Sequence, residues 1–305
     1  MEAEPGNLYA SLGKEVSGAD MQLIQDAFKQ LKGRYDAGSS PLGGIGQITL
    51  MCLAKLNSES QLLECGNAGH KQYLSYQLPT EASRPILSSE FLSDPAVYER
   101  AWNALTERMD PTQRSLGSDS EATNRLLYTT VMAFACCVDL WQRRSRKTPG
   151  TFFEILVGSV LGQLLPDWRR SKHIGIPDSA ERVSTDIVFG NPHRGPDLVC
   201  PVKITTRERI VQPYAHQRIL DAVFGWGTYR SVLFCVSEMQ LDGKKGVKEI
   251  CVPGTIKLFQ QHLASLAAIC YLDPPARYLE NDVRDTLPVH SMGSFLSEVL
   301  WDMTD

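Results

Sequence analysis

Two residues in the middle of the chain, Asp186 and Lys203, have side chains of the kind that hydrolyse phosphodiester bonds beside a bound metal ion. An aspartate carboxylate supplies the oxygen ligands that Mg²⁺ prefers. A Mg²⁺ ion held there would polarise a phosphate and activate a water molecule. A lysine ammonium would stabilise the negative charge that develops during the reaction. These residue types predict a hydrolytic site, provided that the fold brings them together.

A β-hairpin would bring the two residues together. Residues 183–189 and 197–205 are apolar runs of strand length, and residues 191–196 contain the Asn, Pro and Gly that form turns. The midpoint between Asp186 and Lys203 falls inside this turn, so a hairpin folded about it places the two residues opposite each other. Opposed Cβ atoms in a hairpin are about 5 Å apart.

Asp197 is a rival for the catalytic carboxylate because Pro196 and Asp197 form a literal PD dipeptide. However, Asp197 and Lys203 are on one predicted strand, six residues apart. At roughly 3.3 Å per residue they are about 20 Å apart, too far for two groups that act on one atom. Asp186 is therefore the better candidate, and Asp197 is interpreted as part of the turn.

A metal site for this chemistry usually has a second acid or amide. Glu154 is the single charged residue in a predicted apolar helix, residues 149–165, where a carboxylate is costly to bury without a cation. Its alternative interpretation is a half-exposed helix residue. Gln212 and Gln217, on the predicted helix that follows the hairpin, are further candidates.

Arg207, Glu208 and Arg209 follow Lys203 closely, and we call residues 207–209 the recognition segment. Arginine can bond bidentately to guanine O6 and N7, and glutamate can accept from cytosine N4. At a strand end that enters the major groove, the recognition segment would read adjacent G and C bases. The alternative is a surface cluster of salt bridges.

The charge distribution favours a polyanion as the partner. Residues 141–218 contain 13 Lys or Arg and 7 Asp or Glu, a local charge of +6, whereas the whole chain has a net charge of −4. A basic middle on an acidic protein is typical of a face that binds nucleic acid.

Residues 1–145 are predicted to form a mostly helical region without a motif for chemistry. Helices are predicted at residues 20–35, 94–109 and 118–144. Residues 47–56 are apolar and too short to be assigned to helix or strand, and residues 67–87 are polar and rich in turn formers. We expect this region to dimerise or to contact DNA that flanks the recognition site.

Residues 146–275 predict an α/β core with a mixed sheet, because helices and strands alternate along them. The predicted helices are 149–165, 212–224 and 255–268, and the predicted strands are 183–189, 197–205, 231–237, 248–252 and 269–272. Residues 276–305 are predicted to be an acidic tail with an amphipathic helix at residues 292–301.

The cysteine pattern and hydropathy exclude several classes of protein. Most of the eight cysteines lie in apolar runs and none forms a C-x-x-C pair, which is typical of buried thiols rather than disulfides or a zinc site. The N-terminus is acidic and polar, unlike a signal peptide. The apolar residues 126–141 are too few for a membrane span and include Asp139. We therefore expect a cytoplasmic protein with no membrane partner.

The run from Lys203 to Arg209, KITTRER, resembles the K-x-x-x-R-(D/E)-R signature of type II restriction endonucleases that cut CCGG or CCNGG sequences. These enzymes are a branch of the PD-(D/E)xK nucleases in which the second acid lies on the following helix instead of the strand. The sequence agrees in having Pro201 at the strand position. The resemblance covers about residues 150–240 and implies an α/β (α+β) restriction-endonuclease-like core.

The resemblance also implies roles for individual residues. Asp186, Glu154 and Gln217 would hold Mg²⁺, and Lys203 would be the catalytic lysine. The sequence departs from the family at Gln217, where the family usually has Glu, and His216 lies beside it. Gln212, Gln217 and His216 therefore all remain candidates for the third position.

Within the recognition segment, Arg207 and Arg209 would read guanines and Glu208 the paired cytosines. A two-fold symmetric site in double-stranded DNA would require a homodimer. Some relatives flip a base, which needs an aromatic platform; the candidates are Tyr9, Tyr73, Tyr76 and Trp102.

Two alternatives remain open. One is a PD-(D/E)xK nuclease for branched or damaged DNA, such as a junction resolvase or repair nuclease, which would read structure and would not need the recognition segment. The other is a non-catalytic DNA-binding protein in which Lys203 contacts only phosphate.

Overall fold

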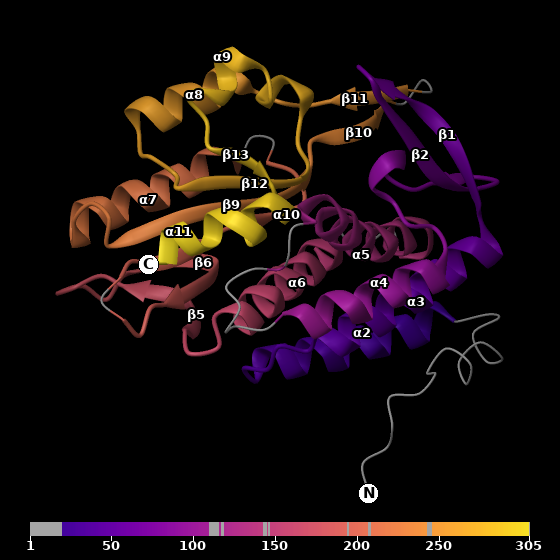
Figure 1. Cartoon of the computed structure of the whole chain (residues 1–305), viewed down its shortest axis with the longest axis horizontal. Coiled ribbons are helices and arrows are strands. Elements are labelled where there is room, and N and C mark those ends of the chain that lie inside the picture. Colours follow the sequence, from indigo (N-terminus) through magenta and orange to yellow (C-terminus); the bar gives the residue numbers. More distant parts are fainter. Residues whose placement is uncertain are drawn as a thin grey trace, which may run out of the picture.

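The computed structural model describes residues 20–109, 116, 119–142, 145, 147–193, 195–206, 209–242 and 246–304. Its centre is a sheet with helices on both faces (Figure 1). Helix α7 (Val211–Phe224) and helix α8 (Pro253–His262) cover one face, and α5 (Ser120–Trp141) and α6 (Thr148–Leu164) cover the other.

The central sheet is mixed, as predicted. In the described residues it has seven strands in the order β13-β12-β9-β7-β6-β5, with β8 also paired to β9. Strands β13, β12, β9, β7 and β8 pair in parallel, whereas β7, β6 and β5 pair antiparallel. The strands are β5 Arg169–Gly175, β6 Arg182–Gly190, β7 Asp197–Cys200, β8 Val202–Lys203, β9 Tyr229–Ser237, β12 Ala268–Asp273 and β13 Val289–Ser291.

Strand β9 explains why the core has helices on both faces. Val232 and Phe234 belong to the hydrophobic cluster on the α5–α6 side, and Leu233 and Cys235 belong to the cluster on the α7–α8 side. Successive side chains of a strand point to opposite faces, so a strand that is apolar throughout needs a cover on each face.

The helical region before residue 145 contains a hairpin that the sequence did not predict. Strands β1 (Gln61–Ala68) and β2 (Lys71–Leu78) pair antiparallel, and the short β3 (Glu81–Ala82) and β4 (Ile86–Leu87) pair with β2. The hairpin is polar in composition because one of its faces is exposed. Residues 47–56, which could not be assigned, lie within a helix. The helices here are α2 Met21–Asp36, α3 Leu42–Glu59 and α4 Pro95–Arg108.

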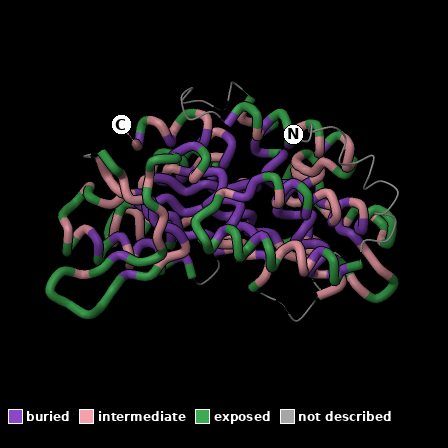
Figure 2. Tube along the Cα trace, turned by 90° about the horizontal axis from the view of Figure 1, so that it is seen from below, coloured by how far each residue is buried: buried purple, intermediate pink, exposed green. Residues whose placement is uncertain are grey.

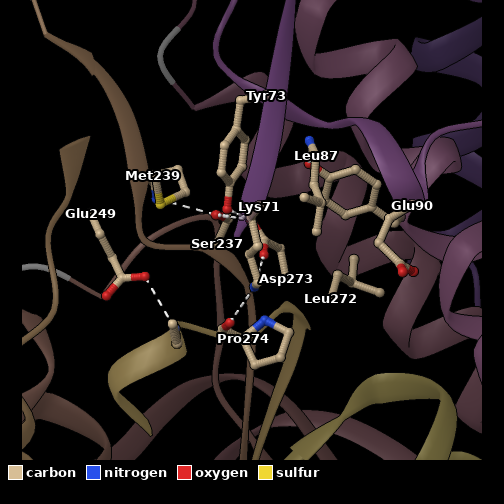
Figure 3. A network of polar contacts seen from close by, with 12 residues as sticks. Lys71, Tyr73, Leu87, Glu90, Ser237, Met239, Glu249, Leu272, Asp273 and Pro274 are labelled. Carbon is tan, nitrogen blue, oxygen red and sulfur yellow. Dashed lines mark hydrogen bonds and ion pairs between the residues drawn. The ribbon is translucent and has the colours of Figure 1, made fainter. Parts of the chain in front are cut away.

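A buried network joins this hairpin to the end of the central sheet. The Asp273 carboxylate accepts hydrogen bonds from Lys71 Nζ (2.6 Å), Tyr73 OH (3.0 Å) and Ser237 Oγ (2.9 Å) (Figure 3). Lys71 Nζ also donates to the Pro274 carbonyl at 2.7 Å. A buried carboxylate is tolerated when it is paired and hydrogen-bonded in this way.

The helical region and the sheet share one hydrophobic cluster, so residue 145 does not separate two cores. That cluster contains residues of α2 to α6 together with residues of β6, β9 and β12, and buried positions run through the middle of the molecule in Figure 2. Gly158 on α6 permits close approach to α2, since a Cβ there would lie within 2 Å of the Tyr35 hydroxyl.

Residues 276–304 pack into the fold instead of extending from it as a tail, and the helix predicted at residues 292–301 is present as consecutive helical elements. Strand β13 pairs with β12 and is followed by α10 (Met292–Ser294), the π-helical η4 (Phe295–Val299) and α11 (Leu300–Thr304). Their apolar residues, Met292, Phe295, Leu296, Leu300 and Met303, are buried. Helical spacing of these apolar residues outweighs the acidic composition, because acidic side chains stay on the exposed face.

Other elements differ in detail from those predicted. Strand β5 was not predicted, and residues 248–252 only overlap β11 (Gly246–Glu249), which forms a separate hairpin with β10 (Met239–Asp242). Helix α8 ends at His262, before the predicted end at residue 268, and Ala268 is the first residue of β12. In the described part of the chain, no helix is both long and apolar enough to cross a membrane.

Candidate active site

The structure brings Asp186 and Lys203 together. Asp186 is on β6 and Lys203 is the last residue of β8, and Lys203 Nζ lies 2.7 Å from Asp186 Oδ2. The same oxygen accepts a hydrogen bond from Val202 N at 2.8 Å. The Asp186 side chain is 30% exposed and the Lys203 side chain 13%, so both are partly accessible to solvent.

The pair is reached by a geometry that differs from the predicted one. In the β6–β7 ladder Ile187 is opposite Cys200, so Asp186 is level with Pro201 and not with Lys203. Proline has no N–H to donate to a ladder, and β7 ends before it. Strand β8 then pairs with β9, where Lys203 is opposite Cys235. The prediction that Lys203 is directly opposite Asp186 is wrong by two residues. The long side chain of Lys203 reaches Asp186 across this offset.

Asp197 has the turn role that the sequence indicates. It is the first residue of β7, and its Oδ1 accepts a hydrogen bond from Asn191 N at 2.8 Å across the turn. The carboxylate of the literal PD dipeptide therefore stabilises the β6–β7 connection.

Glu154 faces the same cavity as Asp186. Its side chain is 16% exposed, and its Oε1 lies 2.5 Å from Lys172 Nζ on β5. Burial raises the pKa of Glu154, the Lys172 ammonium lowers it, and the nearby Asp186 charge raises it. Lys172 is the partner that sequence reasoning missed, because β5 is polar apart from Ile174, its one buried residue, and so has no strand-like apolar pattern.

Two cavities adjoin the Asp186–Lys203 pair. The larger, about 740 Å³, is lined by Glu154, Asp186, Lys203 and Arg209, and also by residues of the helical region, including Arg84. The smaller, about 230 Å³, is lined by Asp186 and Lys203 together with residues of α7. The helical region therefore contributes one wall of the site.

Helix α7 presents Gln212 and His216 to the smaller cavity, and not Gln217. Residues four apart share one face of a helix, whereas the next residue is rotated by about 100°. Gln217 is buried; its Nε2 donates to Asp221 Oδ1 (2.8 Å) and to a backbone carbonyl, and its Oε1 accepts from Ser231 N (3.0 Å). Both ends of this amide are occupied away from the Asp186–Lys203 pair.

His216 is affected electrostatically by the pair. Burial lowers the pKa of His216, the Lys203 ammonium lowers it further, and Asp186 opposes the shift. A neutral imidazole at this position can offer a nitrogen lone pair to a cation.

Only part of the recognition segment lies in the described structure. Arg207 and Glu208 lie outside the described residues. Arg209 is exposed, lines the larger cavity and donates its N–H to the Thr206 carbonyl at 2.9 Å.

Three of the four candidate platforms for a flipped base are buried. Tyr73, Tyr76 and Trp102 pack in the hydrophobic cluster that the helical region shares with the sheet. The hydroxyls of Tyr73 and Tyr76 bond to Asp273 and Asn57, and Tyr9 lies outside the described residues. None of these three rings is placed to stack on a base.

The donor set near Asp186 fits a divalent cation that keeps several waters. Among the described residues Asp186 Oδ1 makes no hydrogen bond, and Glu154 faces the same cavity. No group of three or more His, Cys, Asp or Glu in this part of the chain could enclose a metal by itself. Mg²⁺ is usually held by one or two carboxylates with water and substrate phosphate as its other ligands, so this arrangement suits it.

Comparison with known proteins assigns the family. No protein-family model and no curated protein matches the chain. Among solved structures, the chain is similar to the crystal structure of the type IIP restriction endonuclease Kpn2I, with 36% sequence identity over 92% of this chain and 97% of that chain and a TM-score of 0.83. A second match is the complex of the restriction endonuclease PspGI with substrate DNA, at 12% identity over 68% of this chain and 92% of that chain, with a TM-score of 0.41.

The central mixed sheet, covered by helices on both faces, is the restriction-endonuclease fold. Because the identity and coverage of the Kpn2I match are both high, the chain belongs to the type II restriction endonucleases. The protein is therefore an enzyme, a type II site-specific deoxyribonuclease, and its substrate is DNA.

Proposed function

We propose that the enzyme cleaves double-stranded DNA at a G/C-rich palindrome of the CCGG or CCNGG type, that it requires Mg²⁺, and that it acts as a homodimer. The observation that carries this proposal is the Asp186–Lys203 pair, because the recognition segment begins only four residues after the lysine. A hydrolytic pair and a segment suited to G and C bases are thus consecutive parts of one connection.

Mg²⁺ is proposed to bind at Asp186 and Glu154, where it would polarise the scissile phosphate and activate the attacking water. Lys172 partly neutralises Glu154, so the two carboxylates can lie near each other before the cation arrives. For the third position, the placement of α7 favours Gln212 or His216 over Gln217, which the family resemblance suggested.

Lys203 is proposed to act directly on the phosphate. Its ammonium is held by the Asp186 oxygen that also binds Val202 N, so its position is set before DNA binds. A preorganised cation stabilises the charge that develops on the transferring phosphoryl group without a cost of reorganisation.

Base recognition is proposed to reside in the recognition segment, with Arg207 and Arg209 on guanines and Glu208 on the paired cytosines. Arg209 is exposed and lines the larger cavity. The wall that the helical region adds to this cavity supports a role for residues 1–145 in contacting DNA beside the recognition site.

A homodimer is proposed because the described chain contains one Asp186–Lys203 pair and a double-strand break needs two strands cut. Two copies related by a two-fold axis would match a palindrome. A cytoplasmic location is proposed from the cysteines, all eight of which are free thiols.

The test is to digest DNA of known sequence with the purified enzyme and Mg²⁺ and to sequence the ends. We expect discrete fragments whose ends all derive from CCGG or CCNGG sites, and no cleavage with a chelator. Discrete ends at another sequence would contradict the assigned specificity. A smear, or a preference for branched DNA, would favour the nuclease that reads structure, and specific binding without cleavage would contradict the assigned catalytic pair.

A further inference from the structure

Glu238 is a buried glutamate directly after β9 that does not belong to the Asp186–Lys203 pair. It is 1% exposed. Its Oε1 accepts hydrogen bonds from Thr206 N (2.9 Å), Thr206 Oγ1 (2.5 Å) and Tyr271 OH (2.9 Å). An ionisable group is costly to bury, so convergence of three donors on one oxygen indicates a specific positional role.

Thr206 is the residue that precedes the recognition segment, and its carbonyl accepts the N–H of Arg209 at 2.9 Å. After Arg209, Ile210 is buried in the hydrophobic cluster beneath α7. Both ends of the recognition segment are therefore attached to Thr206, one covalently and one by a hydrogen bond. Glu238 holds Thr206 by its backbone and by its side chain.

The same strand end also positions Lys203. Lys203 is opposite Cys235 on β9, Ser237 N donates to the Ile204 carbonyl at 3.2 Å, and Glu238 binds Thr206. Ser237 is fixed in turn by its bond to Asp273 (Figure 3). The end of β9 therefore lies alongside the chain continuously from the lysine to the start of the recognition segment.

We propose that Glu238 is a positioning residue for sequence recognition: by holding Thr206 it fixes, relative to Lys203, the residue from which the recognition segment begins and to which Arg209 is hydrogen-bonded. The inference rests on the proposed function of the recognition segment. Base-specific hydrogen bonds are directional and lose strength steeply when they are misaligned. Release of Thr206 therefore weakens discrimination between the correct site and sites with one changed base.

The test measures kcat/KM for a correct site and for sites that differ by one base pair, in matched variants. Glu238→Ala removes the anchor. Glu238→Gln keeps an oxygen at the Oε1 position, which accepts these three bonds, and loses only the longer bond from Thr206 N to Oε2 (3.2 Å). Tyr271→Phe is the matched control, because it removes a buried hydrogen bond to the same carboxyl group without freeing Thr206.

We expect Glu238→Ala to lower the ratio of kcat/KM values by about tenfold or more, the equivalent of one lost base contact. Glu238→Gln and Tyr271→Phe are expected to keep the ratio of the wild-type enzyme. An unchanged ratio in Glu238→Ala would overturn the inference. So would an equal loss in Tyr271→Phe, which would indicate general destabilisation, or in Glu238→Gln, which would indicate a role for charge.

A second pair of variants tests the positioning role if Glu238→Ala does not fold. Thr206→Val loses the hydroxyl that binds Glu238, and Thr206→Ser keeps it. A lower ratio in the valine variant alone supports the inference, and equal ratios overturn it.

Glu208→Ala, measured in the same assay, distinguishes a failure of the positioning role of Glu238 from a failure of the recognition segment itself. If Glu208→Ala lowers the ratio and Glu238→Ala does not, only the positioning role fails. If Glu208→Ala leaves the ratio unchanged, recognition lies elsewhere, and both the proposed recognition segment and the role of Glu238 are overturned.

Discussion

The Lys203 ammonium lies 2.7 Å from Asp186 Oδ2, although Lys203 belongs to a strand that pairs with β9 rather than with β6. One carboxylate oxygen thus holds the lysine and the backbone N–H of Val202. The other oxygen makes no hydrogen bond within the described chain and remains available to a cation. A single aspartate can therefore position the lysine and contribute to metal binding at the same time.

Substitution of either member of the pair should abolish cleavage and leave specific binding largely intact. We expect Asp186→Asn and Lys203→Met each to lower the cleavage rate by at least about 10²–10³-fold, since each removes a charge that acts on the reacting phosphate. Single-turnover cleavage and gel-shift titration measure the two effects. Asp26→Asn, which breaks an exposed ion pair on α2, is the control and should cleave normally. Full activity in either variant of the pair would contradict the site.

Substitutions of the three candidate residues on α7 should have two different effects, one on metal binding and one on the stability of the fold. We expect at least one of Gln212→Ala and His216→Ala to weaken metal affinity by about 10–100-fold. Gln217→Ala should instead lower the free energy of unfolding by about 1–3 kcal/mol, because it leaves buried partners without hydrogen bonds. Metal titrations of cleavage and urea unfolding measure the two effects. Loss of metal affinity in Gln217→Ala at unchanged stability would contradict the buried, structural role of Gln217.

Lys203→Met should raise the pKa of His216. Burial is the largest cause that lowers this pKa, the Lys203 charge is the next, and Asp186 raises it. Removal of the ammonium leaves the burial effect, so the pKa should rise but stay below that of a free histidine. NMR titration of the His216 ring protons in the metal-free enzyme measures the change, with Lys29→Met on α2 as the control. An unchanged pKa would show that Lys203 does not lie near the imidazole in solution.

Glu154→Gln should raise the thermal stability of the metal-free enzyme near neutral pH. Because the pKa of Glu154 is raised in the folded state, mainly by burial, its ionisation opposes folding. The contribution of protonated Glu154 to the stability of the fold is fully present at pH values below the pKa of Glu154 in the unfolded chain. It is lost as the pH rises through the pKa of Glu154 in the folded protein. The Glu154→Gln variant, which carries a neutral analogue, should therefore have a higher melting temperature than the wild type near pH 7. At about pH 4, where an ordinary glutamate is mostly protonated, the two melting temperatures should be equal. Melting curves at the two pH values measure this, and a lower melting temperature at neutral pH would contradict the buried-carboxylate account.

Local sequence pattern predicted the parts of the fold that depend on local residues. The apolar runs of β6 and β9 and the cap at Asp94 required no long-range information. The β1–β2 hairpin and the packing of residues 276–304 were missed for the opposite reason. Their polar composition is balanced by apolar residues that are buried against segments far away in the sequence, such as α5.

The sequence by itself indicated that Asp186 and Lys203 lie close together, because a short turn joins the two segments that carry them, but the pairing of β8 with β9 came only from the tertiary structure. The sequence also placed the recognition segment directly after the lysine. Only the tertiary structure decided which face of α7 meets the pair, since Gln212, His216 and Gln217 differ only in helical phase. It alone joined Glu154 to Lys172 and Glu238 to Thr206, because these contacts depend on how an entire sheet and its helices pack together.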